Sequence, residues 1–183
     1  MRASQGEKVI ITKENITCPA SAAAFGLMPL AEKLATGQML YNMGLFASPA
    51  AGQAAMNGMT RLNQGEYPAV LLSPLGGIEL EPDIAVIESK PEHLMWLALA
   101  GIYQTGERLH FNTAVFQATC VDSTVIPFVT QTMNASLGCY GCRDATNIED
   151  NECLIGIPCG QLAELVPNLE ELARKGRGRA ADF

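Results

Sequence analysis

The sequence predicts an α+β fold in a single domain, with a mixed β-sheet packed against several short helices. Three observations support this fold class. The chain has 183 residues, 48% of them hydrophobic, which is enough for one sizeable core. Runs of strand length alternate with longer segments of helical pattern, and no internal repeat or low-complexity linker divides the chain. We expect one globular domain over residues 1–175 and a mobile basic tail over 176–183.

Five segments are expected to form the sheet: residues 8–12, 67–75, 83–89, 109–113 and 153–157. The run 67–75 is apolar nearly throughout, which is typical of a strand covered on both faces. Only a short connection joins it to 83–89. These two strands are therefore expected to be antiparallel neighbours, because a parallel crossover needs about a dozen residues or more.

The first helices are indicated by proline, glycine and serine. Pro19 precedes an alanine-rich stretch and takes the favoured first position of a helix. Glycines and prolines then cut residues 28–62 into short helices. Ser48 and Pro49 predict the cap and first turn of the last of these helices.

Two longer helices are expected in the second half of the chain. Residues 90–105 are mostly apolar, and Ser89 with Glu92 is expected to form a capping box at the start of this helix. From residue 159 to 175, apolar residues recur every three or four positions, as on one face of a helix. Pro167 is expected to kink or divide that helix.

The composition argues against several classes of partner. The net charge is −7 and no basic stripe with interleaved aromatic residues compensates it, so we expect no nucleic-acid partner. No apolar run approaches the roughly 18 to 20 residues of a membrane span, and the first residues do not resemble a signal peptide. We therefore expect a cytoplasmic protein with no membrane partner, in which six cysteines favour metal or redox chemistry over disulfides.

Cys139 and Cys142 form a CxxC motif with a glycine before each cysteine. Two thiols at this spacing can bind one metal or close a small redox disulfide. The glycines allow a sharp turn that directs backbone N–H groups at a thiolate. A closed zinc site or an iron–sulfur cluster usually needs four ligands, so the other cysteines decide what this motif does.

The other four cysteines differ in their surroundings. Cys18 is expected at a helix N-terminus, where the positive end of the helix dipole stabilises a thiolate. Cys120 is expected at an element boundary, because Asp-Ser-Thr follows shortly after it. Cys153 alternates with isoleucines, so it is expected to be buried in the sheet. Cys159 has no assigned role.

Several short motifs occur in a characteristic order. They are Cys18-Pro19-Ala20, Ala24-Phe25-Gly26-Leu27, Phe46-Ala47-Ser48-Pro49, Glu81-Pro82-Asp83, Cys120-Val121-Asp122, the segment from Ser136 to Arg143, and Gly156-Ile157-Pro158. Together they resemble the prokaryotic family called domain of unknown function 169, which is frequent in archaea and anaerobic bacteria. The resemblance spans nearly the whole chain and implies no activity.

The resemblance carries two further expectations. Members of that family usually have an additional N-terminal segment, and residues 1–6 look like the end of it, so the chain is expected to be short at its start. Cys18, Cys120 and Cys139 fall on the family's cysteine positions. Cys142 falls where other members can have serine.

We hypothesise from these patterns an iron–sulfur protein in which Cys18, Cys120, Cys139 and Cys142 bind one cluster, most simply of the four-iron type. Such a cluster would exchange electrons with a redox partner protein or hold a small-molecule ligand. One alternative is a structural zinc site with the same thiols, in a binding module whose pocket is lined by methionines 28, 39, 43, 56 and 59. The other is a metal-free protein in which Cys139 and Cys142 cycle between dithiol and disulfide.

Arg143 directly follows the second thiol of the motif. We expect its guanidinium to turn toward the cluster, where it would offset the negative charge of four thiolates or hold a carboxylate substrate. The alternative is a surface ion pair with Asp144 or Glu149, which would contribute roughly 0 to 1 kcal/mol.

Overall fold

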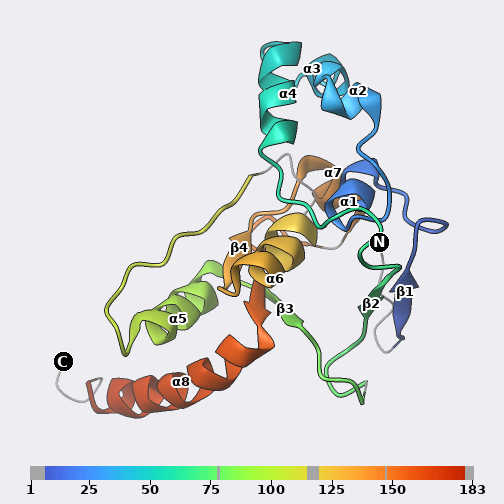
Figure 1. Cartoon of the computed structure of the whole chain (residues 1–183). Coiled ribbons are helices and arrows are strands. Elements are labelled where there is room, and N and C mark those ends of the chain that lie inside the picture. Colours follow the sequence, from blue (N-terminus) through green and yellow to red (C-terminus); the bar gives the residue numbers. More distant parts are fainter. Residues whose placement is uncertain (1–6, 78, 115–119, 147, 180–183) are drawn as a thin grey trace.

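The structure of the chain is a computed structural model that describes residues 7–77, 79–114, 120–146 and 148–179 (Figure 1). Its strands lie in two small sheets, with helices packed around them. This arrangement confirms the predicted α+β class. Two segments lie outside the described residues. They are residues 1–6, which were expected to be the end of an additional N-terminal segment, and residues 180–183, which were expected to belong to the mobile tail.

The strands do not form one mixed sheet. β1 (Val9–Ile11) and β2 (Val70–Leu72) form an antiparallel ribbon of their own. The second sheet has the order β3 (Ile84–Ser89), β5 (Cys153–Pro158), β4 (Asn134–Ser136), and both of its pairings are antiparallel. The expectation of a mixed sheet was therefore wrong, and so was the pairing of β2 with β3. Apolar strand pattern predicts that a segment pairs, but it does not select the partner.

The strand expected at residues 109–113 was also wrong. The backbone of this segment is held by one side chain instead of a ladder: Asn112 N–H donates to Asn134 Oδ1 at 2.7 Å, and Asn134 Nδ2 donates back to Asn112 O at 2.9 Å. Asn134 belongs to β4, which the sequence did not predict as a strand. The asparagine amide imitates a peptide group and so satisfies backbone that would otherwise need strand pairing.

The short helices of the first half share one core. They are α1 (Pro19–Ala24), α2 (Glu32–Ala35), α3 (Gln38–Asn42) and α4 (Pro49–Asn57). As predicted, Ser48 caps the last of them, because its Oγ accepts the Ala51 N–H at 3.2 Å. Buried residues of these helices pack with Val121, Val125 and Ile126 from the middle of the chain.

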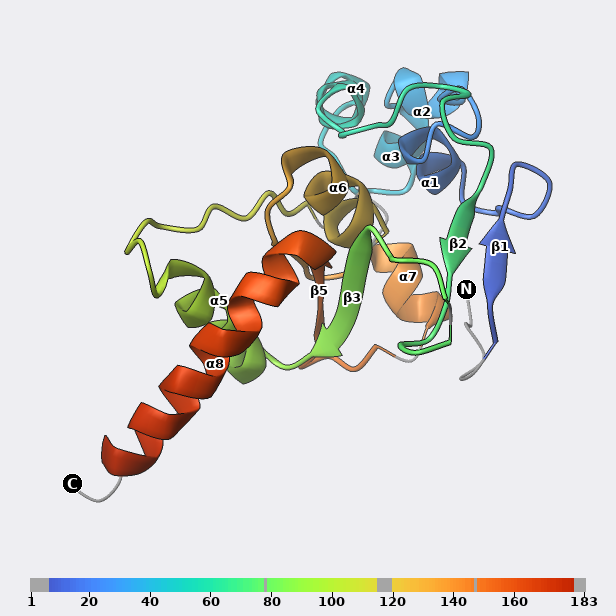
Figure 2. The same ribbon diagram turned by 60° about the horizontal axis from the view of Figure 1, so that its bottom comes forward.

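A second core lies between the three-stranded sheet and two longer helices, α5 (Pro91–Ile102) and α8 (Cys159–Arg179). Leu97, Ile155, Ile157 and Leu165 are buried in it. α8 continues through Pro167 and includes residues 176–179, which were expected in the tail. Figure 2 shows this helix projecting away from the rest of the chain, with α5 alongside it.

The predicted capping box of α5 was wrong. Ser89 is the last residue of β3, where it pairs with Cys153, and the residue at the N-cap is Lys90. The hydroxyl of Ser89 instead lies 3.1 Å from Nδ1 of His93. Pairing with β5 holds Ser89 in the strand, one residue before the N-cap position of α5. Tertiary contacts therefore override the local motif.

The two cores meet at a π-helical turn, η1 (Val121–Val125), which continues into α6 (Ile126–Thr130). η1 packs directly on β5: a Cβ atom placed on Gly156 would lie only 1.9 Å from the carbonyl oxygen of Ser123. Only glycine permits this approach. The glycine therefore fixes the position of η1, and with it the position of Cys120 at the start of that turn.

Candidate functional site

Three segments far apart in the sequence carry the cysteines of interest. Cys18 is the N-cap of α1, as predicted, with extended backbone at φ −85° and ψ 112°. Cys120 directly precedes η1. Cys139 is the N-cap of α7 (Tyr140–Ala145), and Cys142 lies within that helix. α1 and α7 lie near one another in both Figure 1 and Figure 2.

Cys120 joins two of these segments directly. Its Sγ donates a hydrogen bond to Oγ of Ser21, in α1, at 2.9 Å. Burial raises the pKa of the Cys120 thiol from 9.0 to about 12. The hydrogen bond with Ser21 lowers this pKa, whereas the nearby thiols Cys18 and Cys142 raise it. Thiols from two other segments therefore affect the pKa of Cys120, which holds its proton at neutral pH when no metal is bound.

The CxxC motif forms the predicted tight turn. Cys142 N–H donates to Sγ of Cys139 at 3.3 Å and to the carbonyl oxygen of Cys139 at 3.0 Å. Gly138 adopts the left-handed conformation, with φ +80°, and its N–H donates to Oγ of Ser136 at 3.2 Å. A hydrogen bond from backbone N–H stabilises negative charge on the Cys139 sulfur, as the glycine-flanked motif led us to expect.

Cys18 and Cys142 both raise the pKa of the Cys120 thiol, and the Cys142 N–H donates to the sulfur of Cys139. All six cysteines are in the described part of the chain, and none forms a disulfide. Among the described residues, no three His, Cys, Asp or Glu side chains are gathered as closely as one metal ion requires.

The other two cysteines lie outside this group. Cys153 is 3% exposed on β5, which confirms its predicted burial, and burial raises the pKa of its thiol. Cys159 begins α8, and its N–H donates to the carbonyl oxygen of Asp83 at 3.0 Å. Burial raises the pKa of Cys159, with smaller contributions from Glu81 and Asp83.

Arg143 is bound to backbone carbonyl groups. Nε donates to Leu137 O at 2.7 Å, while Nη1 and Nη2 donate to Glu149 O and Glu152 O, each at 2.8 Å. The guanidinium thus contacts the backbone before and after α7. Arg143 binds the backbone carbonyl group of Glu149. The sequence had suggested that its guanidinium either turns toward a cluster or forms an ion pair with a nearby carboxylate.

Sequence reasoning missed Asp122, which it used only as part of the Asp-Ser-Thr run that places Cys120 at an element boundary. This carboxyl group is 1% exposed, and its Oδ2 accepts the Ala114 N–H at 3.2 Å. Its Oδ1 has no hydrogen-bond partner among the described residues. Burial raises the pKa of Asp122 from 3.8 to about 7. An acidic residue two positions after Cys120 was visible in the sequence, but its burial in a π-helical turn, a feature often found at functional sites, was not.

The methionines do not share one environment. Met56 and Met59 are buried in the first core, whereas Met28 and Met43 are exposed. Two of the five are thus ordinary core residues.

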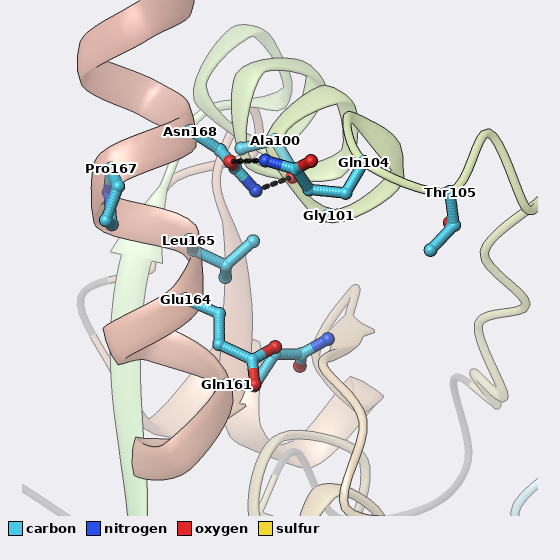
Figure 3. A pocket seen from close by; sticks show the side chains of 9 residues that line it. All are labelled: Ala100, Gly101, Gln104, Thr105, Gln161, Glu164, Leu165, Pro167 and Asn168. Carbon is cyan, nitrogen blue, oxygen red and sulfur yellow. Dashed lines mark hydrogen bonds between the residues drawn. The ribbon is translucent and has the colours of Figure 1, made fainter.

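A groove of about 400 Å³ lies between α5 and α8. Figure 3 shows Asn168 at its end, where Nδ2 donates to Ala100 O and Oδ1 accepts a hydrogen bond from Gln104, both at 3.0 Å. These contacts fasten α8 to α5 directly after Pro167. The side-chain polar atoms of Asn168 are hydrogen-bonded within the protein, so this residue has a structural role at the groove.

Comparison with known proteins places the chain among relatives without an assigned activity. The family model DUF169, described as "Uncharacterised ArCR, COG2043", matches residues 1–168. The chain is also similar to the uncharacterised protein MJ0308 of Methanocaldococcus jannaschii, with 26% identity over 165 residues that cover 90% of this chain and 70% of that protein. No solved structure is significantly similar to it. Within the described residues, no helix is both long and apolar enough to cross a membrane. The extent of the family match, together with the cysteine motifs that it contains, shows that the chain belongs to the DUF169 family.

Proposed function

We propose that this protein binds an iron–sulfur cluster, most simply of the four-iron type, through Cys18, Cys120, Cys139 and Cys142. One observation carries the proposal: the partly buried thiol of Cys120 donates a hydrogen bond to Ser21 in α1, and Cys18 and Cys142 both raise the pKa of this thiol. Four thiolates are the usual ligands of such a cluster. Cys18 and Cys120 also pack against the first core, and a shared cofactor would give all four thiols a common role.

A cluster and a single zinc ion differ in how closely they gather their ligands. All ligands of one zinc ion lie about 2.3 Å from the same point. Such close gathering is not seen among the described residues. Each thiolate of a four-iron cluster binds a different iron, so these ligands are more widely spaced. The two cofactors therefore require different sulfur spacings, and metal analysis distinguishes them.

The surroundings of the thiols fit a negatively charged cofactor. The Cys142 N–H already points at Sγ of Cys139, and the hydroxyl of Ser21 can donate to the Cys120 sulfur once its proton is lost. Hydrogen bonds to cluster sulfurs offset negative charge and tune the reduction potential. When bound, the cluster would supply one-electron chemistry or an open iron for a small ligand.

The test is protein prepared without oxygen and analysed for iron, acid-labile sulfide, zinc and visible absorption. We expect iron and sulfide in equal amounts and a broad visible band that is lost in Cys120→Ser and Cys139→Ser. The matched control is Cys159→Ser, which removes a thiol outside the group. Colourless wild-type protein without iron after reconstitution with iron and sulfide would contradict the proposal, and stoichiometric zinc would establish the structural alternative.

A metal-free dithiol is the second candidate, favoured by the Cys142 N–H that lies 3.3 Å from Sγ of Cys139. Stabilisation of one thiolate by a helix N-terminus is a feature of CxxC redox proteins. This function predicts a Cys139–Cys142 bridge after mild oxidation, detected by mass spectrometry, with a defined reduction potential. It also predicts no bound iron, so the same preparation distinguishes the two candidates.

A further inference from the structure

The CxxC motif lies in the connection between two paired strands. β4 ends at Ser136 and β5 begins at Cys153, and the two strands are antiparallel neighbours in which Ser136 pairs with Leu154. Residues 137–152 therefore leave the sheet and return to it at the same place. Sheet pairing fixes both ends of this connection, but it does not fix the position of α7 and its thiols beyond the sheet.

Arg143 bridges the two arms of the connection. Its Nε donates to the carbonyl oxygen of Leu137, which lies on the arm before α7. Its two terminal nitrogens donate to Glu149 and Glu152, which lie on the arm after it. One planar group therefore makes three bonds of 2.7 to 2.8 Å that close the connection at its base.

The arm after α7 is itself an ordered turn. Glu152 N–H donates to Glu149 O at 3.0 Å, and Glu149 N–H donates to Oε2 of Glu152 at 2.8 Å. The arm before α7 is held by the bond from Gly138 N–H to Ser136 Oγ. Arg143 thus joins two arms that are each locally fixed, and the thiols of Cys139 and Cys142 lie between them.

We propose that Arg143 is a positioning residue that holds Cys139 and Cys142 at a fixed place relative to Cys18 and Cys120. Its role depends on the fork geometry of the guanidinium, which can serve three carbonyl groups in one plane, and not on its charge alone. The proposal rests on the proposed function insofar as the four thiols share one cofactor. The fixed position of the CxxC turn itself is independent of that cofactor.

The test compares Arg143→Lys, Arg143→Gln and wild type with a matched control, Arg61→Lys. Arg61 also donates to two backbone carbonyl groups, those of Met59 and Met56, but it does so at the end of α4. Lysine keeps the charge and loses the fork, so it separates position from electrostatics.

Two quantities are measured on protein prepared without oxygen. The first is the rate at which iodoacetamide alkylates Cys139 and Cys142 in metal-free protein, resolved by mass spectrometry with Cys159 as internal reference. The second is the rate at which reconstituted protein loses iron to a chelator. We expect both Arg143 variants to change the alkylation rate of Cys139 and Cys142. We also expect both to raise the rate of iron loss about 10-fold or more, whereas Arg61→Lys should keep wild-type values of both rates.

Wild-type alkylation rates in folded Arg143→Lys would overturn the positioning role. Loss of the fold in both Arg143 variants, judged by circular dichroism, would also overturn it, because Arg143 would then be a general stabilising residue. If wild-type protein binds no iron, the proposed function fails, but the alkylation rates still decide the role of Arg143. The two proposals can therefore fail separately.

Discussion

The thiol of Cys120 donates a hydrogen bond to the hydroxyl of Ser21, which lies 99 residues earlier in the chain, at 2.9 Å. Both residues sit at the junction between the first core and the π-helical turn η1. This contact fixes the distance between α1, which begins after Cys18, and the thiol at the start of η1. It is the most direct link between segments of the candidate site.

Ser21→Ala removes this contact. We expect it to lower the free energy of unfolding of metal-free protein by about 1 kcal/mol, because the hydrogen bond between buried Ser21 and partly buried Cys120 is lost. The pKa of Cys120 should rise further, since Ser21 now lowers it, and alkylation of Cys120 should slow. Urea unfolding and mass spectrometry measure these effects.

Ser48→Ala is the control for that substitution. It removes a helix cap and should also cost about 1 kcal/mol, but without any change at Cys120. Equal alkylation rates of Cys120 in the two variants would contradict a specific contact between Ser21 and this thiol.

Asp122 should make the stability of the metal-free protein depend on pH. Its pKa is raised from 3.8 to about 7, so the native state binds the proton more tightly than the unfolded chain does. The resulting stabilisation is complete below about pH 4 and is lost as the pH rises through about 7. A shift of about three pKa units corresponds to at most roughly 4 kcal/mol.

Asp122→Asn removes this titration. We expect the free energy of unfolding of wild type to fall between about pH 4 and about pH 7 relative to that of the variant, measured by urea unfolding of metal-free protein. The same pH dependence in both proteins would show that Asp122 is not the titrating group.

Gly156→Ala should separate η1 from β5. The added Cβ would meet the carbonyl oxygen of Ser123 at 1.9 Å, and backbone must move to accommodate it. We expect a loss of about 1 to 3 kcal/mol in the free energy of unfolding, with reduced iron content because Cys120 moves with η1. Gly160→Ala is the control: nothing lies within 4 Å of its added Cβ, so stability should stay the same or rise by up to about 1 kcal/mol.

Asn134→Ala should lower the stability of the protein more than the removal of one small side chain suggests. The amide of Asn134 donates to Asn112 O and Asp122 O and accepts the Asn112 N–H, and the residue is 2% exposed. Its loss leaves the buried carbonyl oxygen of Asp122 unpaired and removes both bonds to the backbone of Asn112, for which we expect a loss of about 1 to 3 kcal/mol in the free energy of unfolding, measured by thermal or urea unfolding. Asn63→Ala, which loses one exposed contact with Glu66, should change stability by less than about 0.5 kcal/mol.

Local patterns in the sequence determined the class of the fold and the identity of the candidate thiols. Ser48 before Pro49 predicted a capped helix, and alternation with isoleucine predicted the burial of Cys153, because both effects depend on neighbours in the chain. The glycines around Cys139 predicted a turn that points an N–H at its sulfur for the same reason.

The partners of these elements were decided only by tertiary structure. Ser89 fits a capping box locally, but pairing with Cys153 holds it in β3. The sequence around Asn134 shows no helical or strand periodicity, yet the side-chain amide of Asn134 holds the backbone of Asn112. Arg143 beside a CxxC motif suggested a charge facing a cofactor, whereas its three carbonyl acceptors come from segments that only the folded chain brings together. Periodicity and caps report on contacts a few residues apart, but the contact between Cys120 and Ser21 depends on how α1 and η1, distant in sequence, pack together in the first core.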